Sequence, residues 1–414
     1  MPKLDLRGSA RRRDAITAQR LDQVVPGLMA RHGVDCWILV SREYAEDPVA
    51  QTMLPATWMS SRRRTVLAFF NRDGEHERQA VTRYEGDGLF PAAWDPDKQG
   101  DQWAALADMV RAADPQRIAV STSDHFAHAD GLTSTEAQHL LVALGPASAS
   151  RVVSGEALAV GWLNTRIASE RPGFEEACHE AHEILRRALS PEAVTPGTTT
   201  TADLEWWLRD AVQSLGTTVW FHPTASVQRP GADLRGSFAS AAKAHTIEPG
   251  DLIHIDFGII WDHLCTDQQQ HGYALKSGEA AVPDGLNQAM ERANRVQDLL
   301  IAEYQVGRSG NEVLRAALEK SVAEGLEPKI YTHPIGYHGH GAGPTIGLWD
   351  QQEGVAGAGE IEIDGPSAWS IELMNRSEVP EWGGPVNIML EEDAWFEDGV
   401  IDFVDGRQTE IWAI

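Results

Sequence analysis

The sequence is short of positive charge. Its 414 residues include 35 Lys and Arg against 61 Asp and Glu, which gives a formal net charge of −26 at pH 7. Nucleic acids and anionic membranes bind cationic surfaces, so neither is expected as the main partner. The balance fits a soluble cytosolic enzyme, with an acidic surface that only aids solubility as the alternative.

Cysteines and long apolar runs are also scarce. The three cysteines, Cys36, Cys178 and Cys265, lie far apart, so no disulfide framework or CxxC metal site is implied. No run of about 18 apolar residues occurs, so no membrane span is expected. The opening residues, MPKLDLRGSARRRD, lack the apolar stretch of a secretory signal. We therefore expect a cytoplasmic protein.

The length predicts two domains, because 414 residues exceed one core of typical size. Over residues 1–165, short apolar runs alternate with helical stretches, which predicts an α/β domain. Asp14 is the expected N-cap of its first helix. The expected strands are 36–40, 65–70 and 117–120, and the expected helices are 14–32, 101–113 and 134–144.

Residues 166–414 have a different pattern. A long helix, a loop of Gly and polar residues, a capped helix and strands follow one another twice. In the first pair, one helix is expected over 172–189, and Thr201 and Glu205 flank the start of the other. In the second pair, the helices are expected over 284–304 and 307–322, and Ser309 and Glu312 form a capping box in the latter. Such a repeat predicts a pseudo-twofold α+β domain, with chance similarity of two capped helices as the alternative.

Two aspartates interrupt the apolar segment IHIDFGIIWDHLCTDQ, residues 253–268. A chain reversal between Trp261 and Asp262 would place Asp256 directly opposite Asp267, because strand side chains alternate between faces. Carboxylates about 5 Å apart repel each other unless a cation lies between them. The pair therefore indicates a metal site, with a solvated hairpin as the alternative.

A second pair of acids follows the same logic. Glu372 lies in AWSIELMN, Glu391 and Glu392 lie in VNIMLEEDAWF, and the turn residues of EVPEWGGP come between them. A hairpin with its midpoint between Glu381 and Trp382 places Glu372 opposite Glu391. Only one of Glu391 and Glu392 can join Glu372, because adjacent strand residues face opposite sides.

Histidines supply a third element. The segment HPIGYHGHGAGPTIGLWD holds His333, His338 and His340 among glycines, which let backbone approach closely. A single histidine is more often structural. Beside two acid pairs, a His-Gly-His run predicts a metal ligand or an acid–base group.

Together these elements resemble the pita-bread metallopeptidase superfamily, which includes methionine aminopeptidase, Xaa-Pro aminopeptidase, prolidase and creatinase. The resemblance covers about residues 170–414. It implies an α+β pita-bread catalytic domain over 166–414, preceded by the smaller α/β, creatinase-like N-terminal domain of the Xaa-Pro aminopeptidase and prolidase branch. The family's two aspartates are eleven residues apart, its metal histidine lies in a G-H-G-x-G-like segment, and its glutamates lie in T-h-E-like and h-E-D-like strands.

By this resemblance, two divalent ions (Mn, Co or Zn) are held by five side chains: Asp256, Asp267, His340, Glu372 and Glu391, with Glu392 as the alternative to Glu391. Glu372 would also act as general base, and a metal-bridging hydroxide would cleave the bond before proline. A homodimer is implied as well. The alternative is a metal-dependent lyase or a hydrolase of a small non-peptide substrate on the same scaffold.

Three positions depart from the family's peptidases. A second histidine usually follows the metal histidine by seven residues, where this chain has Gly347. Another histidine usually precedes the first Asp by about 17 or 18 residues, where this chain has Phe238 and Ala239. An Arg usually stands three residues after the second Asp, where this chain has Gln270. These departures put the peptidase reaction in doubt but leave the metal ligands in place. His338 and His222 are the expected catalytic substitutes, with His333 as a further candidate.

Two other groups of residues have open interpretations. Trp220, Trp261, Trp349, Trp369, Trp382 and Trp395 lie near the motifs and either line an apolar substrate pocket or pack in the core. Arg62, Arg63 and Arg64 form either a solvated basic patch or a contact to a substrate carboxylate.

Overall fold

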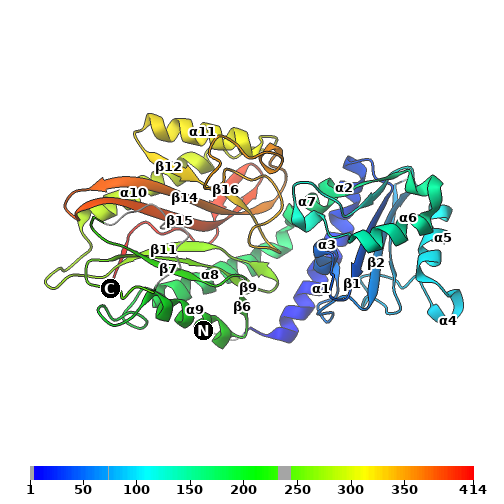
Figure 1. The fold of residues 1–414 in the computed structure, drawn as a ribbon, viewed down its shortest axis with the longest axis horizontal. Coiled ribbons are helices and arrows are strands. Elements are labelled where there is room, and N and C mark those ends of the chain that lie inside the picture. Colours follow the sequence, from blue (N-terminus) through cyan, green and yellow to red (C-terminus); the bar gives the residue numbers. More distant parts are fainter. Residues whose placement is uncertain (1–3, 73, 232–243) are drawn as a thin grey trace. The chain divides into compact units, whose positions relative to one another are not determined.

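The computed structural model describes residues 4–72, 74–231 and 244–414, and Phe238 and Ala239 lie outside them (Figure 1). The chain divides into two compact units, Asp5–Thr165 and Arg166–Ile414, and Leu4 belongs with the second. Within the described residues, no helix combines the length and apolarity needed to span a membrane.

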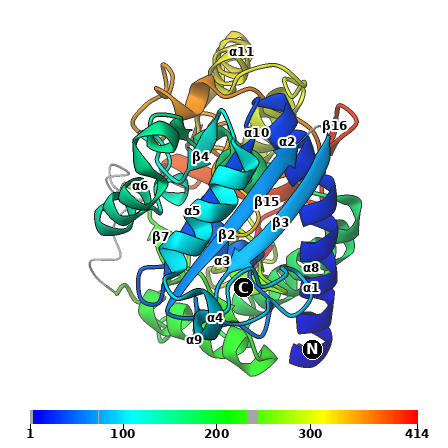
Figure 2. The same cartoon turned by 90° about the vertical axis from the view of Figure 1, so that its right-hand side faces the viewer.

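The N-terminal unit is built on a five-stranded mixed sheet with the order β3-β2-β1-β4-β5 (Figure 2). β1 is antiparallel to β2 and parallel to β4, and β4 is parallel to β5. The strands are β1 (Cys36–Arg42), β2 (Arg64–Arg72), β3 (Glu75–Val81), β4 (Ile118–Val120) and β5 (Val152–Ser154). The three expected strands and the α/β class of this unit are confirmed.

Helices pack against this sheet. The helices are α1 (Leu6–Gln23), α2 (Val25–Arg31), α3 (Pro48–Met53), α4 (Pro96–Gln99), α5 (Gln102–Ala113), α6 (Ser134–Ala149) and α7 (Glu156–Asn164), with a 3-10 turn η1 (Ala127–Ala129). Alternate side chains of β1 and β2, such as Ile38 and Ala68, form one core with Leu106 of α5 and Leu140 of α6.

The first helix differs from the prediction. α1 begins at Leu6, and a second helix, α2, starts after Val24 with Pro26 in its first turn. Asp14 therefore lies inside α1 and is not a cap. Its carboxylate accepts a hydrogen bond from the main-chain N–H of Ala56 at 2.7 Å.

The C-terminal unit is an α+β fold around a large sheet. Its central path is β12-β14-β15-β11-β8-β7, with β13 beside β14, β16 beside β15 and β17 beside β11, and a small sheet has the order β10-β9-β6. The strands are β6 (Thr218–Val219), β7 (Thr224–Gln228), β8 (Leu252–Phe257), β9 (Ile259–Trp261), β10 (Leu264–Cys265), β11 (Gln268–Tyr273), β12 (Glu327–Ile330), β13 (His333–Ile335), β14 (Ser367–Val379), β15 (Gly384–Glu397), β16 (Val400–Phe403) and β17 (Trp412–Ala413).

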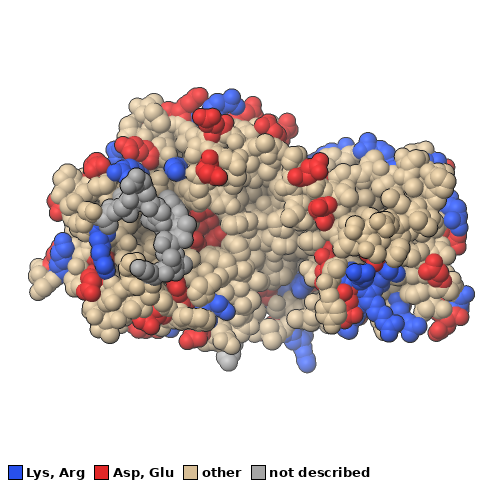
Figure 3. Space-filling view, in the orientation of Figure 1, with Lys and Arg blue, Asp and Glu red and all other residues tan. Residues whose placement is uncertain are grey.

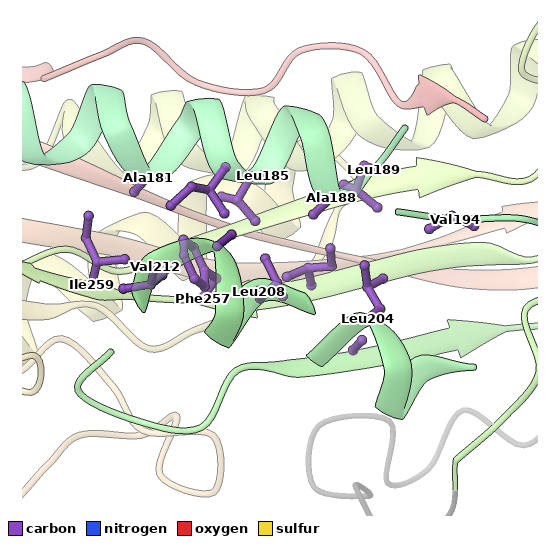
Figure 4. Packing of buried hydrophobic residues seen from close by; sticks show 14 of the residues in the cluster. Ala181, Leu185, Ala188, Leu189, Val194, Leu204, Leu208, Val212, Phe257 and Ile259 are labelled. Atoms are coloured by element: carbon purple, nitrogen blue, oxygen red, sulfur yellow. The ribbon is translucent and has the colours of Figure 1, made fainter. Parts of the chain in front are cut away.

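Two pairs of helices pack on this sheet. The helices are α8 (Arg171–Ala188), α9 (Thr201–Leu215), α10 (Asp284–Ile301) and α11 (Gly310–Ala323), with 3-10 turns η2 (Ala168–Glu170) and η3 (Ala358–Glu360). Leu185 of α8 and Leu208 of α9 meet Phe257 of β8 in one core (Figure 4). A second core joins α10 and α11 to β12 and β14. The expected α+β architecture with two similar halves is confirmed.

The helix caps agree only partly with the prediction. Ser309 and Glu312 form the expected capping box of α11: the Ser309 hydroxyl accepts from the Glu312 N–H at 3.3 Å, and the Glu312 carboxylate accepts from the Ser309 N–H at 2.9 Å. In α9 the cap is Thr200, paired with Asp203. The helix begins at Thr201, as expected, while Glu205 takes no part in the cap and accepts a hydrogen bond from the N–H of Ala225.

Candidate metal centre

The second acid pair forms as predicted. β14 and β15 are antiparallel, and Glu372 lies directly opposite Glu391. Both side chains are buried. Alternation along β15 turns Glu392 to the other face of the sheet.

In the first acid pair, the partner of Asp256 lies two residues from the predicted one. The chain reverses at Asp262 and His263, both with positive φ (48° and 74°), so β8 and β11 pair Asp256 with Gln269. The prediction that Asp267 lies directly opposite Asp256 was therefore wrong. Asp267 still shares a face with Gln269, two residues on, and is the diagonal neighbour of Asp256.

These registers produce one row of polar side chains across four strands. Asp256 on β8 pairs with Gln269 on β11, Gln269 pairs with Glu391 on β15, and Glu391 pairs with Glu372 on β14. The row thus brings together carboxylates that are up to 135 positions apart in the 414-residue chain.

Gln269 lies at the centre of the row. Its Nε2 donates to Oε1 of Glu372 at 2.6 Å and to Oε2 of Glu391 at 2.7 Å. Its Oε1 lies 2.8 Å from Nε2 of His254, which donates to it. Gln269 was not among the predicted site residues. Its place on the same face as Asp267, two residues away, was the available signal.

Donor atoms converge around this row in three groups, within each of which they lie no more than 4.8 Å apart. The groups are Asp256, Asp267 and Glu391; His333, Glu372 and Glu391; and Asp267, His333 and His340. All five predicted ligands therefore occur in the groups, and His333 occurs in two of them.

His333 lies beside the acids. Its Nδ1 lies 3.0 Å from the Pro334 carbonyl, which accepts when Nδ1 carries the proton, and in that neutral tautomer Nε2 offers a lone pair. Nε2 is buried, has no hydrogen-bond partner among the described residues and lies 3.7 Å from Oε1 of Glu391. His340 is exposed, and its ring centroid lies 4.8 Å from that of His333.

The acids are electrostatically uncompensated. Burial raises the pKa of Asp256, Asp267 and Glu372, and the charge of Glu391 adds to the rise. Burial opposes ionisation of Glu391 too, but neighbouring His333 and hydrogen bonds from Ser370 and Gln269 lower its pKa. Among the described residues, no Lys or Arg pairs with any of the four, and Oδ1 of Asp267 is buried without a partner.

Glu392 and Gln270 belong to a different network. Glu392 accepts from Nε2 of Gln270 at 2.8 Å and from the N–H of Gln408 at 2.7 Å, and its Oε2 lies 2.9 Å from Nε2 of His182. The other nitrogen of His182 lies 2.8 Å from Asp405. This network lies on the face of β15 that turns away from Glu372.

The remaining predicted residues are less closely involved. His338 is half-buried, two residues from His340, and His222 is exposed, 3.3 Å from Arg209 and 3.6 Å from Glu205. Neither occurs in the donor groups. Gly347 has φ +74°, and a Cβ there would lie 2.3 Å from the Ile330 carbonyl, so no histidine fits at this position.

Aromatic rings surround His340. Its ring centroid lies 5.2 Å from that of Trp220 and 5.7 Å from that of Tyr331, which in turn lies 6.1 Å from Trp349. Trp220 needs a glycine beneath it, because a Cβ on Gly339 would lie 2.2 Å from its ring. Trp261, Trp369, Trp382 and Trp395 are instead buried in the core.

Comparison with known structures gives the same architecture. The X-Pro aminopeptidase from Thermotoga maritima MSB8 is 16% identical, with a TM-score of 0.66 over 92% of this chain and 98% of that chain. The Xaa-Pro dipeptidase from Bacillus anthracis is 15% identical, with a TM-score of 0.63 over 98% and 100%. The prolidase from Pyrococcus furiosus is 14% identical, with a TM-score of 0.60 over 92% and 99%. These similarities show the fold.

The sequence itself matches a defined family. No curated protein matches the chain. The model of metallopeptidase family M24 matches residues 173–388, which is more than half of the chain. This range includes four of the five predicted ligands, and Glu391 lies just beyond it. This protein belongs to metallopeptidase family M24.

Proposed function

We propose that this protein is a peptidase that holds two divalent metal ions and cleaves small peptides at the bond before proline. The observation that carries the proposal is the sharing of Asp267 and Glu391 between donor groups. Carboxylates shared in this way can bridge two cations about 3.5–4 Å apart. The family membership supports a metal-dependent peptidase, and the Xaa-Pro enzymes of the same fold support the choice of substrate.

The donor set fits such ions. Asp256, Asp267, Glu372, Glu391 and an imidazole would hold the ions. Buried carboxylates with an imidazole suit Mn²⁺, Co²⁺ or Zn²⁺. Oδ1 of Asp267 and Nε2 of His333 are buried atoms that have no hydrogen-bond partner in the part of the chain that the structure describes. Two cations would compensate the mutual repulsion that raises the pKa of these acids.

We further propose His333, rather than His340, as the imidazole ligand. His333 is buried, its Nδ1–H is held by a carbonyl, and its Nε2 points at Glu391. This assignment also meets the family's seven-residue spacing, since His340 is the seventh residue after His333. His340 then stands where the family places its substrate-binding histidine, and the lack of a histidine at Gly347 is no longer a departure.

The chain's own residues would divide the remaining work. When bound, the ions supply a Lewis acid that activates water near neutral pH. By the family resemblance, Glu372 would take the proton from that water as general base. His340 would donate to the substrate carbonyl. His338, two residues away, stays a candidate for a second contact with the substrate. The catalytic role of His222 stays a prediction, and no contact between His222 and the donor groups supports it.

The aromatic rings favour an apolar substrate group. Trp220, Tyr331 and Trp349 lie around His340, and a pyrrolidine ring packs well on aromatic faces. We also propose a homodimer, which the family resemblance implies. Light scattering tests it by measuring the molar mass in solution.

Hydrolysis of a matched peptide panel tests the function. The full chain, loaded in turn with Mn²⁺, Co²⁺ and Zn²⁺, is given Xaa-Pro di- and tripeptides and the same peptides with Ala in place of Pro. We expect turnover of the proline peptides at least about tenfold faster, a difference of about 1.4 kcal/mol in barrier. Absence of turnover by protein that contains metal would reject the peptidase and favour the lyase or small-molecule hydrolase.

A further inference from the structure

The N-terminal unit contains a pocket that the peptidase proposal does not use. Its volume is about 420 Å³, and its lining comes only from residues 42–102. Five of the lining residues are arginines: Arg42, Arg62, Arg63, Arg64 and Arg83. In a chain with a net charge of −26, this concentration of positive charge is unusual. Figure 3 shows Lys and Arg side chains gathered on this unit, near the strands labelled β1 and β2 in Figure 1.

Two of the arginines are held in place. Glu136, whose side chain is 2% exposed, lies 3.1 Å from Arg42 and accepts two hydrogen bonds from Arg64. The Arg64 guanidinium also lies 4.8 Å from the ring centroid of Trp103. One carboxylate therefore orients two guanidinium groups and leaves one positive charge in excess.

The other three arginines have no such partner. Within the described part of the chain, no carboxylate lies within ion-pair distance of Arg62, Arg63 or Arg83. Glu43 is the one acidic residue in the lining. After subtraction of Glu43 and Glu136, the pocket keeps an excess of positive charge.

The backbone beside the pocket is fixed in a costly conformation. Arg63 and Tyr44 have φ values of 54° and 68°, a region that non-glycine residues seldom adopt and that is enriched at ligand sites. The Glu43 N–H donates to the Arg63 carbonyl at 2.6 Å, which ties the two segments together. Buried Gln102 donates to the carbonyls of Arg64 and Val81 at 3.0 and 2.6 Å.

Aromatic side chains complete the lining. Tyr44 is 93% exposed and Tyr84 is 51% exposed, and Trp94 is half-buried beside them. Large rings left open to solvent beside guanidinium groups provide stacking surfaces for a planar ligand.

We propose that this pocket binds a small organic dianion with an aromatic or apolar body, whose carboxylates or phosphate are held by the guanidinium groups. Arginine is suited to both groups because its fork matches two acceptor oxygens. The excess charge would concentrate such anions locally although the whole chain repels them. The inference is independent of the metal centre, since every residue in it comes from the N-terminal unit.

Calorimetric titration of the full chain tests this site. The probes are phthalate, a dicarboxylate, and phenyl phosphate, which together separate the two anion sources, with benzyl alcohol as the uncharged control at equal ionic strength. We expect a dissociation constant of about 1 mM or lower for at least one anion, and none for the alcohol. Affinity should fall as salt rises.

Four variants locate the binding. Arg62→Gln and Arg63→Gln should each weaken the anion about tenfold, because each removes a charge-assisted hydrogen bond. Arg111→Gln, a change of an exposed arginine on α5 outside the pocket, should have no effect. Absence of binding by the unaltered chain, or binding that resists both pocket variants, overturns the proposal. Binding that is lost instead in Asp267→Asn assigns the anion to the metal centre and overturns it as well.

Discussion

Glu372 lies directly opposite Glu391 on adjacent antiparallel strands, and one amide group, that of Gln269, donates to both carboxylates. Burying two acids face to face is unfavourable, and a single neutral amide offsets only part of the repulsion. Asp256 and Asp267 add two more buried carboxylates to the same cluster. A structure that concentrates negative charge in this way is suited to hold cations.

Substitutions of Glu391 and Glu392 should have different effects on metal affinity. Glu391→Gln should weaken metal binding at least about 100-fold, because a donor shared by two ions is lost. Glu392→Gln should keep both ions, since Glu392 faces His182 and Gln270 on the other side of β15. Equilibrium dialysis with Mn²⁺ measures both variants. Loss of metal only in the Glu392 variant would mean that the face assignment of β15 is wrong.

Loss of His333 should affect metal affinity, whereas loss of His340 should affect peptide hydrolysis. His333→Ala should lower metal affinity by about ten- to 100-fold or more, because it removes the buried imidazole. His340→Ala should retain the metals and lower kcat/KM for peptides. Metal titration and peptide kinetics on the same preparations check both. If His340→Ala instead loses the metals and His333→Ala keeps them, His340 is the ligand, as first expected from the sequence.

Gln269 should act as a positioning residue. Gln269→Leu removes the donor shared by Glu372 and Glu391, so metal affinity should fall about ten- to 100-fold. Gln270→Leu is the matched control, because it makes the same change one residue away and affects only Glu392. The control should lower the free energy of unfolding without changing metal affinity. Equal metal affinities in both variants and the unaltered chain would contradict this role.

His182 should make stability depend on pH. Burial lowers its pKa, but Glu392 and Asp405 outweigh burial and raise the pKa from 6.5 to about 10. Because the folded pKa is raised, this stabilisation is complete below about pH 6.5 and is lost as pH rises toward 10. His182→Gln should therefore cost about 3 kcal/mol at pH 7.

The pH dependence provides the control for His182. Urea unfolding of the unaltered chain and of His182→Gln, both in EDTA, measures the difference at pH 7 and at pH 9.5. The difference should shrink at the higher pH as the imidazolium loses its proton in the folded chain. A difference that stays constant across this range would show that His182 is not charged in the folded state.

The sequence predicts much of the site because strand geometry has only two faces. Alternation and the turn residues between Glu372 and Glu391 were enough to place that pair opposite each other. The turn of the Asp256 hairpin is centred one residue later than predicted, which shifts the partner of Asp256 by two residues, because the turn uses positive φ at Asp262 and His263, where no glycine marks it. An error of this size moves a side chain to a diagonal position on the same face.

The roles of His333 and Gln269 could not be read from local pattern. His333 is buried because the short strand β13 pairs with β14, whose partner residue Ser370 lies 37 positions later in the sequence. Gln269 is central because β11 lies between β8 and β15. Both facts depend on strand order, and a His-Gly-His run gives no information about which ring is buried.

Anomalous diffraction from crystals grown with Mn²⁺ tests the metal centre directly. We expect two anomalous peaks per chain among the carboxylates of Asp256, Asp267, Glu372 and Glu391, one of them beside Nε2 of His333. A map without a peak at these residues, or with both ions bound elsewhere, would contradict this expectation.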